Sequence, residues 1–154
     1  MPKVVPLHEL LEMAGREGEP SSWLEIDQDQ IDLFADATRD RQFIHVDPEK
    51  AAQTPLGTTI AHGFLTLSLL PYLGEENGVV PEGLLMAFNY GLDKLRFIQP
   101  VPVGSEVRLT SKILKVTEKD PGRILVSAEA TVEIKGEAKP ALVAETLTMF
   151  VVAG

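Results

Sequence analysis

The stretch "TTIAHGFLTLSLLPYLG", residues 58–74, decides how the rest of this 154-residue chain is interpreted. Its large apolar residues are distributed around the whole helical circumference and comprise Ile60, Phe64, Leu65, Leu67, Leu69 and Leu70. A helix that is apolar on all sides is buried in the interior of a protein. Thr58 or Thr59 is the predicted N-cap, and Gly74 is the predicted end. The stretch therefore predicts a buried helix.

Four strand-like runs follow this helix. They are "LLMAFNYGLDKLRFIQ" (84–99), "SEVRLTSKILKVTE" (105–118), "RILVSAEATVEIKG" (123–136) and "ALVAETLTMFVVA" (141–153). The segments between them, "PVPVG", "KDPG" and "EAKP", have the composition of turns. Because short connections favour antiparallel neighbours, the four runs predict an antiparallel sheet.

Two elements are predicted upstream of the apolar helix. "SWLEI", residues 22–26, alternates and contains strand-forming residues, so it predicts a short strand. "QDQIDLFADAT", residues 28–38, places Ile31, Phe34 and Ala35 on one face and predicts a helix. That helix is capped by Asp27 or Asp29.

The segment between the two helices contains most of the chain's polar motif residues. "RDRQFIHVD", residues 39–47, interrupts the helical pattern and predicts a loop. "PEKAAQT", residues 48–54, predicts a short helix, with Pro48 in its first turn and Asp47 as its N-cap. Residues 1–20 are expected to be a peripheral N-terminal segment.

The order of elements favours an α+β fold. One strand and several helices precede four strands, and a long antiparallel sheet wrapped around a buried central helix satisfies this pattern. This is the hot-dog fold, expected as a single domain over residues 1–154. An open sheet of this kind is protected when its edge meets a second copy, so we expect a homodimer.

Composition excludes several classes of function. The chain has no cysteine, which rules out disulfides, thiolate nucleophiles and cysteine-based zinc sites. Its three scattered histidines form no HExxH motif, and we expect no metal. A net charge of −9 with 14 dispersed basic residues argues against nucleic acid. No signal-like or membrane-spanning segment is evident, so we expect a cytoplasmic protein without a membrane partner.

Asp40 and His45 are the candidate acid–base pair. They lie immediately upstream of "GTTIAHG" (57–63), which leads into the apolar helix. The first N–H groups of a helix lack internal partners and attract negative charge, and Gly63 allows a ligand to approach that backbone. An acid, a base and an oxyanion-binding amide are the groups needed to add or remove water across a polarised double bond. The alternative is a solvated loop containing two ordinary polar residues.

Other residues are weaker candidates for binding or orienting a substrate. They are His62, Thr66, Ser68 and Asn89. Each has a structural alternative. His62 fixes the junction between loop and helix, Thr66 and Ser68 bond to helical carbonyls, and Asn89 is a structural residue of a strand. Lys94 and Arg96 fit a solvated face better than a phosphate site.

The motif residues resemble a known family. "FADATRDRQFIHVDPEKAA…GTTIAHGF" is similar to the motif of the MaoC-like dehydratases, the (R)-specific enoyl-CoA hydratases (hydratase 2). The family motif is Gly-Asp-x-Asn-Pro-aliphatic-His-x5-Ala, and this chain matches it at Asp40, Ile44, His45 and Ala51. Arg39, Gln42 and Phe43 replace the Gly, Asn and Pro. The text most resembles the NodN-like branch, and the similarity covers roughly residues 20–152.

The resemblance implies an (R)-specific enoyl-thioester hydratase, which is a 3-hydroxyacyl-thioester dehydratase in reverse. It implies that Asp40 and His45 hold and deprotonate the water, that Gly63 N–H binds the thioester oxygen, and that Gln42 orients the reacting groups. The substrate is an acyl thioester of CoA or an acyl carrier protein, and no cofactor is expected. Two alternatives remain open: a non-catalytic acyl-CoA binding protein, and a hot-dog thioesterase. The thioesterase is disfavoured because residues 60–73 contain no Asp or Glu.

Overall fold

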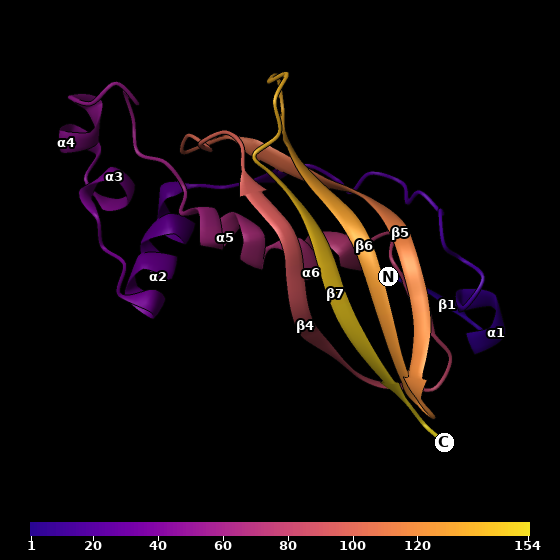
Figure 1. Ribbon diagram of the computed structural model, residues 1–154. Helices are drawn as coiled ribbons and strands as arrows, with labels where there is room; N and C mark the ends of the chain where they lie inside the picture. The colour runs from indigo at the N-terminus through magenta and orange to yellow at the C-terminus, as the bar shows by residue number, and fades with distance from the viewer.

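A curled antiparallel sheet forms one layer of the molecule, and two consecutive short helices lie across its inner face (Figure 1). The computed structural model describes all 154 residues. The strands are β1 (Lys3–Val5), β2 (Leu24–Glu25), β3 (Val79–Pro81), β4 (Leu84–Phe97), β5 (Glu106–Asp120), β6 (Arg123–Ile134) and β7 (Leu142–Val152). The helices are α1 (Leu7–Leu10), α2 (Gln28–Thr38), α3 (Phe43–Val46), α4 (Pro48–Ala52), α5 (Gly63–Ser68) and α6 (Leu70–Glu75).

The main sheet has five strands in the order β2-β5-β6-β7-β4, and every neighbouring pair is antiparallel. All four strand-like runs in the C-terminal half form strands, and the short upstream run forms β2. The predicted α+β hot-dog fold is thus confirmed. A separate two-stranded parallel pair, β1 with β3, was not predicted.

The central helical segment differs from its prediction. It begins at Gly63 rather than near Thr59, it is interrupted at Leu69, and α6 continues to Glu75. The residues before Gly63 are extended because Ile60 forms a β-bridge with Pro102. None of the helices has the length and apolar character that crossing a membrane requires.

The central helical segment is also only partly buried. Leu65 and Leu73 are buried, whereas Phe64 and Tyr72 are 64% and 62% exposed. One face of the segment thus packs on the sheet and the other is open. The prediction of burial on all sides is wrong for this outer face.

The two largest apolar clusters hold the layers together. The larger lies between α2, α5 and the sheet, and its buried members are Ile26, Ile31, Ala61, Leu65, Val101, Val107, Val132, Ile134, Ala141, Leu142 and Ala144. The smaller consists of Val5, Leu10, Ile124, Val126 and Phe150. Its first two members come from the N-terminal segment, so residues before position 20 contribute to a core. Gly15 and Gly18 also donate backbone hydrogen bonds to β5, at 2.7 and 2.9 Å.

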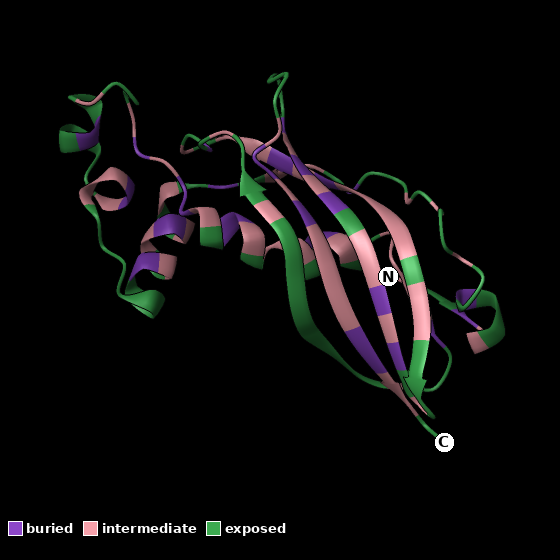
Figure 2. Ribbon diagram, in the orientation of Figure 1, coloured by how far each residue is buried: buried purple, intermediate pink, exposed green.

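Strand β4 forms an open edge of the main sheet and is exposed along nearly its whole length (Figure 2). Its exposed side chains are largely apolar; Leu85, Phe88 and Tyr90 are 65%, 50% and 61% exposed. Its pairing with β7 is interrupted by three register shifts. Strands β6 and β7, which lie inside the sheet, contain buried residues at intervals along their length.

Candidate active site

The chain reaches the site through the end of α2. Asp27 caps the start of this helix by accepting a hydrogen bond from Gln30 N at 2.9 Å, as predicted. At the other end Arg39 adopts φ 68°, in the left-handed region, and terminates the helix. The following residue is Asp40, whose side chain is 54% exposed. Its Oδ1 accepts one long hydrogen bond, 3.4 Å from Gln42 N.

His45 lies in the short helix α3 rather than in the predicted loop, and only 7% of it is exposed. Its Nδ1 is 2.7 Å from the carbonyl oxygen of Ile60. A carbonyl only accepts hydrogen bonds, so Nδ1 carries the hydrogen and Nε2 is the unprotonated nitrogen of the neutral ring. Burial lowers the pKa of His45 below its ordinary value of 6.5, against the raising effect of the Ile60 hydrogen bond. The ring is therefore neutral at pH 7, with a free lone pair on Nε2.

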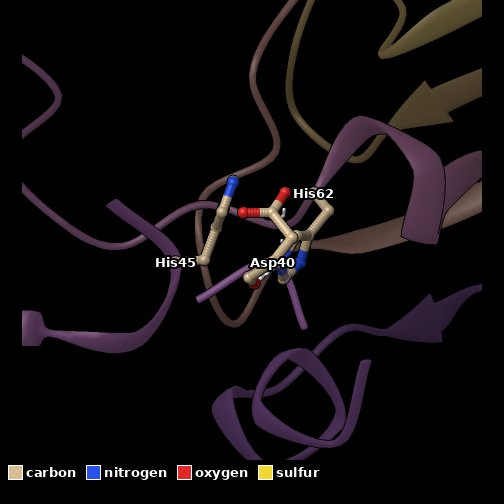
Figure 3. A group of neighbouring side chains, drawn as sticks. All are labelled: Asp40, His45 and His62. Atoms are coloured by element: carbon tan, nitrogen blue, oxygen red, sulfur yellow. Dashed lines mark hydrogen bonds and ion pairs between the residues drawn. The ribbon is translucent and has the colours of Figure 1, made fainter. Parts of the chain in front are cut away.

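His62 joins the two candidate residues (Figure 3). Its buried ring stacks on His45 with centroids 3.8 Å apart, and its Nε2 donates a 2.9 Å hydrogen bond to the main-chain oxygen of Asp40. The same Nε2 is 4.0 Å from Asp40 Oδ2. One carboxylate oxygen of Asp40 and one nitrogen of each ring lie within 4.8 Å of one another. The sequence placed Asp40, His45 and His62 in one region, and the structure brings them together.

The stacked arrangement does not suit a metal ion held by both rings. An imidazole binds a metal along a lone pair that lies in the plane of its own ring. The His45 and His62 planes differ by only 22° and are stacked, so their nitrogen lone pairs do not converge. One nitrogen of each ring is already in a hydrogen bond to a carbonyl oxygen.

A cavity of about 320 Å³ lies beside His45. Its lining is largely apolar and consists of His45, Ile60, Ala61, Gly63, Phe64, Thr66, Phe97, Ile98, Gln99, Pro100, Val101 and Ala141. Gly63 N donates no hydrogen bond within the chain. A Cβ at this position would lie 3.0 Å from the Phe97 ring, so a larger residue would force that ring to shift by a few tenths of an ångström. A base and a free backbone donor thus face one apolar cavity.

The other predicted residues lie in less specific surroundings. Gln42 is the N-cap residue of α3, but its exposed side chain makes no hydrogen bond. Ser68 is exposed and donates to Phe64 O at 2.7 Å, the structural alternative considered for it. Asn89 is exposed on β4 and is not one of the residues that line the cavity. Asp47 caps α4 by accepting from Lys50 N at 3.1 Å, as predicted.

Two further residues line the cavity: Thr66, a weak pocket-lining candidate from the sequence, and Phe97, which sequence reasoning missed. Thr66 is buried, and its hydroxyl has no hydrogen-bond partner within the protein. The bond to a helical carbonyl that was considered for Thr66 is therefore not made, and its position three residues after Gly63 places it on the same side of the helix. Phe97 comes from the end of β4 and meets Phe64 edge-on, with ring centroids 5.8 Å apart. No short-range pattern could have paired Phe97 with Gly63.

Comparison with known proteins identifies the family of this chain. A family model described as "MaoC like domain" matches residues 10–138. The chain belongs to the MaoC-like domain family. Among its relatives, 3-hydroxyacyl-thioester dehydratase Z of Mycobacterium tuberculosis is 50% identical over 143 residues, which cover 93% of this chain and 94% of the relative. Nodulation protein N of Rhizobium leguminosarum bv. viciae is 46% identical over 136 residues, which cover 88% and 84%.

Solved structures of other proteins share the fold of this MaoC-like chain. The monoamine oxidase regulatory protein from Archaeoglobus superposes with a TM-score of 0.78 at 21% identity, covering 100% of this chain and 99% of the other. The (R)-hydratase from A. caviae involved in PHA biosynthesis superposes with a TM-score of 0.70 at 24% identity, covering 88% and 94%. These structures agree with the predicted fold, and the family model and the two relatives confirm the family and the branch recognised in the motif.

Proposed function

We propose that this protein is an (R)-specific enoyl-thioester hydratase, which in reverse is a 3-hydroxyacyl-thioester dehydratase. The observation that carries the proposal is the free Nε2 of a neutral His45 at an apolar cavity that also receives the unpaired Gly63 N–H. One oxygen of the Asp40 carboxylate lies within 4.8 Å of a nitrogen of His45 and of a nitrogen of His62. The relative that is 50% identical over nearly the whole chain has the name of a 3-hydroxyacyl-thioester dehydratase.

The proposed chemistry begins with a water molecule held by Asp40 and His45. The water oxygen bonds to Cβ of the trans-2-enoyl thioester while its proton passes to the Asp40–His45 pair. The electrons of the double bond move toward the thioester oxygen, which accepts a hydrogen bond from Gly63 N–H. Proton return from the pair to Cα completes the (R)-3-hydroxyacyl thioester and restores the pair.

These groups have sufficient catalytic effect without a cofactor. A positioned acid or base typically contributes about 10²–10⁴ in rate. One oxyanion donor contributes about 10²–10³. We therefore propose that the reaction uses only residues of the protein and the acyl thioester. We also propose that it takes place in the cytoplasm.

We propose that the protein works as a homodimer formed through β4. This edge strand exposes apolar side chains that a monomer would leave in water, including Leu85, Phe88 and Tyr90. It ends at Phe97, which lines the cavity, so a second copy on this edge would also border the site. Sedimentation equilibrium of the native chain and of Phe88→Asp tests this: we expect a dimer and a monomer, respectively. A monomeric native chain at micromolar concentration would rule out the dimer.

The experiment that tests the function follows the absorbance of the conjugated enoyl thioester after EDTA treatment of the protein. Crotonyl-CoA, longer enoyl-CoAs and an enoyl-carrier thioester are the substrates, and chiral chromatography identifies the product. We expect loss of absorbance and an (R)-3-hydroxy product. The control variant is His8→Gln, which should keep the native activity because His8 is exposed and distant in sequence from Asp40, His45 and His62. Binding without turnover on every substrate would favour the acyl-CoA binding protein, and release of free thiol would favour the thioesterase.

A further inference from the structure

Two polar side chains that do not line the cavity connect the segments that hold His45. Gln28 is the first residue of α2, and its Oε1 accepts a 2.6 Å hydrogen bond from the Thr59 hydroxyl. Its Nε2 donates to the main-chain oxygen of His45 at 2.7 Å and to Asp32 Oδ1 at 2.9 Å. One amide therefore joins α2, α3 and the extended stretch before α5.

The chemistry of the partners allows only one orientation of this amide. The main-chain oxygen of His45 only accepts, so it must face the NH₂ group of Gln28. The carbonyl group of Gln28 then faces Thr59, whose hydroxyl donates. Thr59 is completely buried and makes no other side-chain hydrogen bond. Water cannot readily replace Gln28 as its partner.

This connection affects the catalytic ring at two places. Gln28 fixes the main chain of His45 itself. Thr59 directly precedes Ile60, and the carbonyl of Ile60 accepts the Nδ1 hydrogen of the His45 ring. A main-chain hydrogen bond from Ile60 N to Ile44 O, 3.0 Å long, also joins the segment that contains Ile60 to α3. The bonded pair Gln28 and Thr59 thus holds both the main chain of His45 and the segment whose carbonyl orients the His45 ring.

We propose that Gln28 and Thr59 are positioning residues, which together direct Nε2 of His45 at the water in the cavity. We call this pair the Gln28–Thr59 clamp. The clamp touches neither the substrate nor the reacting atoms, and its kinetic effect rests on the proposed hydratase function. Loosening it lets the His45 ring move, and a displacement of about 1 Å is enough to cost about 100-fold in rate.

The kinetic experiment compares clamp variants with matched controls. Thr59→Val removes the hydroxyl at nearly constant volume, and Gln28→Met removes the amide at similar length. We expect kcat to fall about 10- to 100-fold while KM is unchanged, because the cavity wall is intact. Thr59→Ser should restore the rate. The controls are Thr58→Val and Gln30→Met, whose side chains make no hydrogen bonds, and we expect wild-type kcat from both.

A double variant distinguishes a shared clamp from two independent effects. If both residues act through one connection, Gln28→Met with Thr59→Val should be no slower than the slower single variant. A product of the two separate losses would overturn the shared clamp. Wild-type kcat in both single variants would overturn the proposal, whatever happens to their thermal stability. If Thr59→Val does not fold, Gln28→Glu decides: it keeps an acceptor for Thr59 but loses the donor to His45, and wild-type kcat would overturn the proposal.

A spectroscopic measurement tests the clamp without any turnover. The Nδ1 hydrogen of His45, held in a hydrogen bond to a carbonyl, should give a downfield proton resonance that His45→Ala removes. We expect this hydrogen to exchange with water at least about tenfold faster in Thr59→Val and Gln28→Met, and normally in Thr59→Ser. If the native protein hydrates no enoyl thioester, the proposed function fails and this measurement alone decides. An unchanged exchange rate in both clamp variants would then overturn the clamp.

Discussion

His45 and Asp40 lie in one cluster, but they belong to regions that are built differently. His45 is buried, its ring bonds to Ile60 O, its main chain bonds to Gln28, and His62 covers one face. Asp40 follows the last turn of α2, and more than half of its side chain is exposed. Its carboxylate has only the 3.4 Å contact with Gln42 N.

The difference separates folding from chemistry at the two positions. Burial and hydrogen bonds that hold His45 also contribute to the stability of the fold, so its loss affects both. Asp40 contributes a charge at the surface, where side-chain changes rarely alter stability by more than about 0.5 kcal/mol. The sequence predicted both residues in one loop, where substitutions at the two positions would have had similar effects on stability.

The largest expected effect is that of His45→Ala. Hydratase kcat/KM should fall about 10²–10⁴-fold, because the base is removed. The free energy of unfolding should also fall by about 1–3 kcal/mol, because Ile60 O loses its buried donor. Initial rates and urea denaturation measure the two effects. Near-normal turnover would show that His45 is not the base.

Asp40→Asn should cause a loss of activity of the same order, about 10²–10⁴-fold. Stability should change by less than about 0.5 kcal/mol, since the side chain is exposed and the main-chain oxygen that His62 uses remains. The same two assays apply. A drop in stability as large as that of His45→Ala would remove the distinction between the two regions.

The pH dependence of stability should also differ between the two positions. The lowered pKa of His45 means that the folded state binds fewer protons than the unfolded state between its folded pKa and 6.5. Stability from this group is therefore fully present above pH 6.5 and is lost as the pH falls through the folded pKa. Urea denaturation over this range should show the loss in the native chain and in Asp40→Asn. The loss should be smaller in His45→Ala, and equal slopes in all three would contradict the assignment.

The smallest expected effect is a gain in stability from Arg39→Gly. Arg39 has φ 68°, a conformation that glycine adopts without steric cost and other residues adopt at a cost of about 1 kcal/mol. It is also the position at which the family motif has glycine. We expect the free energy of unfolding to rise by up to about 1 kcal/mol, with activity unchanged. A lower melting temperature for Arg39→Gly would show that the arginine side chain stabilises the turn.

Local patterns were sufficient for most elements of the fold. The helix α2 has the predicted bounds because its cap and its apolar face are both determined by residues that are close together in the sequence. The four long strands were predicted from β-forming runs and turn residues. The start of the central helix was not, because Ile60 pairs with Pro102 and no local pattern contains that contact.

The sequence also predicted part of the site, namely the residues that belong to the motif. The motif indicated Asp40 and His45, and their distance from Gly63 in the sequence suggested one cavity. Gln28 carried no such signal, because its partners are 17 and 31 residues away and depend on how three segments pack. His62 was recognised only as a weak candidate, since stacking on His45 is a property of the folded chain.

The three register shifts in β4 also affect how an isolated chain behaves. A long apolar edge strand is a template on which unrelated strands add and proteins aggregate. Each irregularity bends the strand and breaks the even spacing of its free N–H and C=O groups. A flat strand from a misfolded chain cannot pair with such an edge along its whole length. The same feature that shapes the sheet should therefore keep newly made chains from aggregating in a crowded solution.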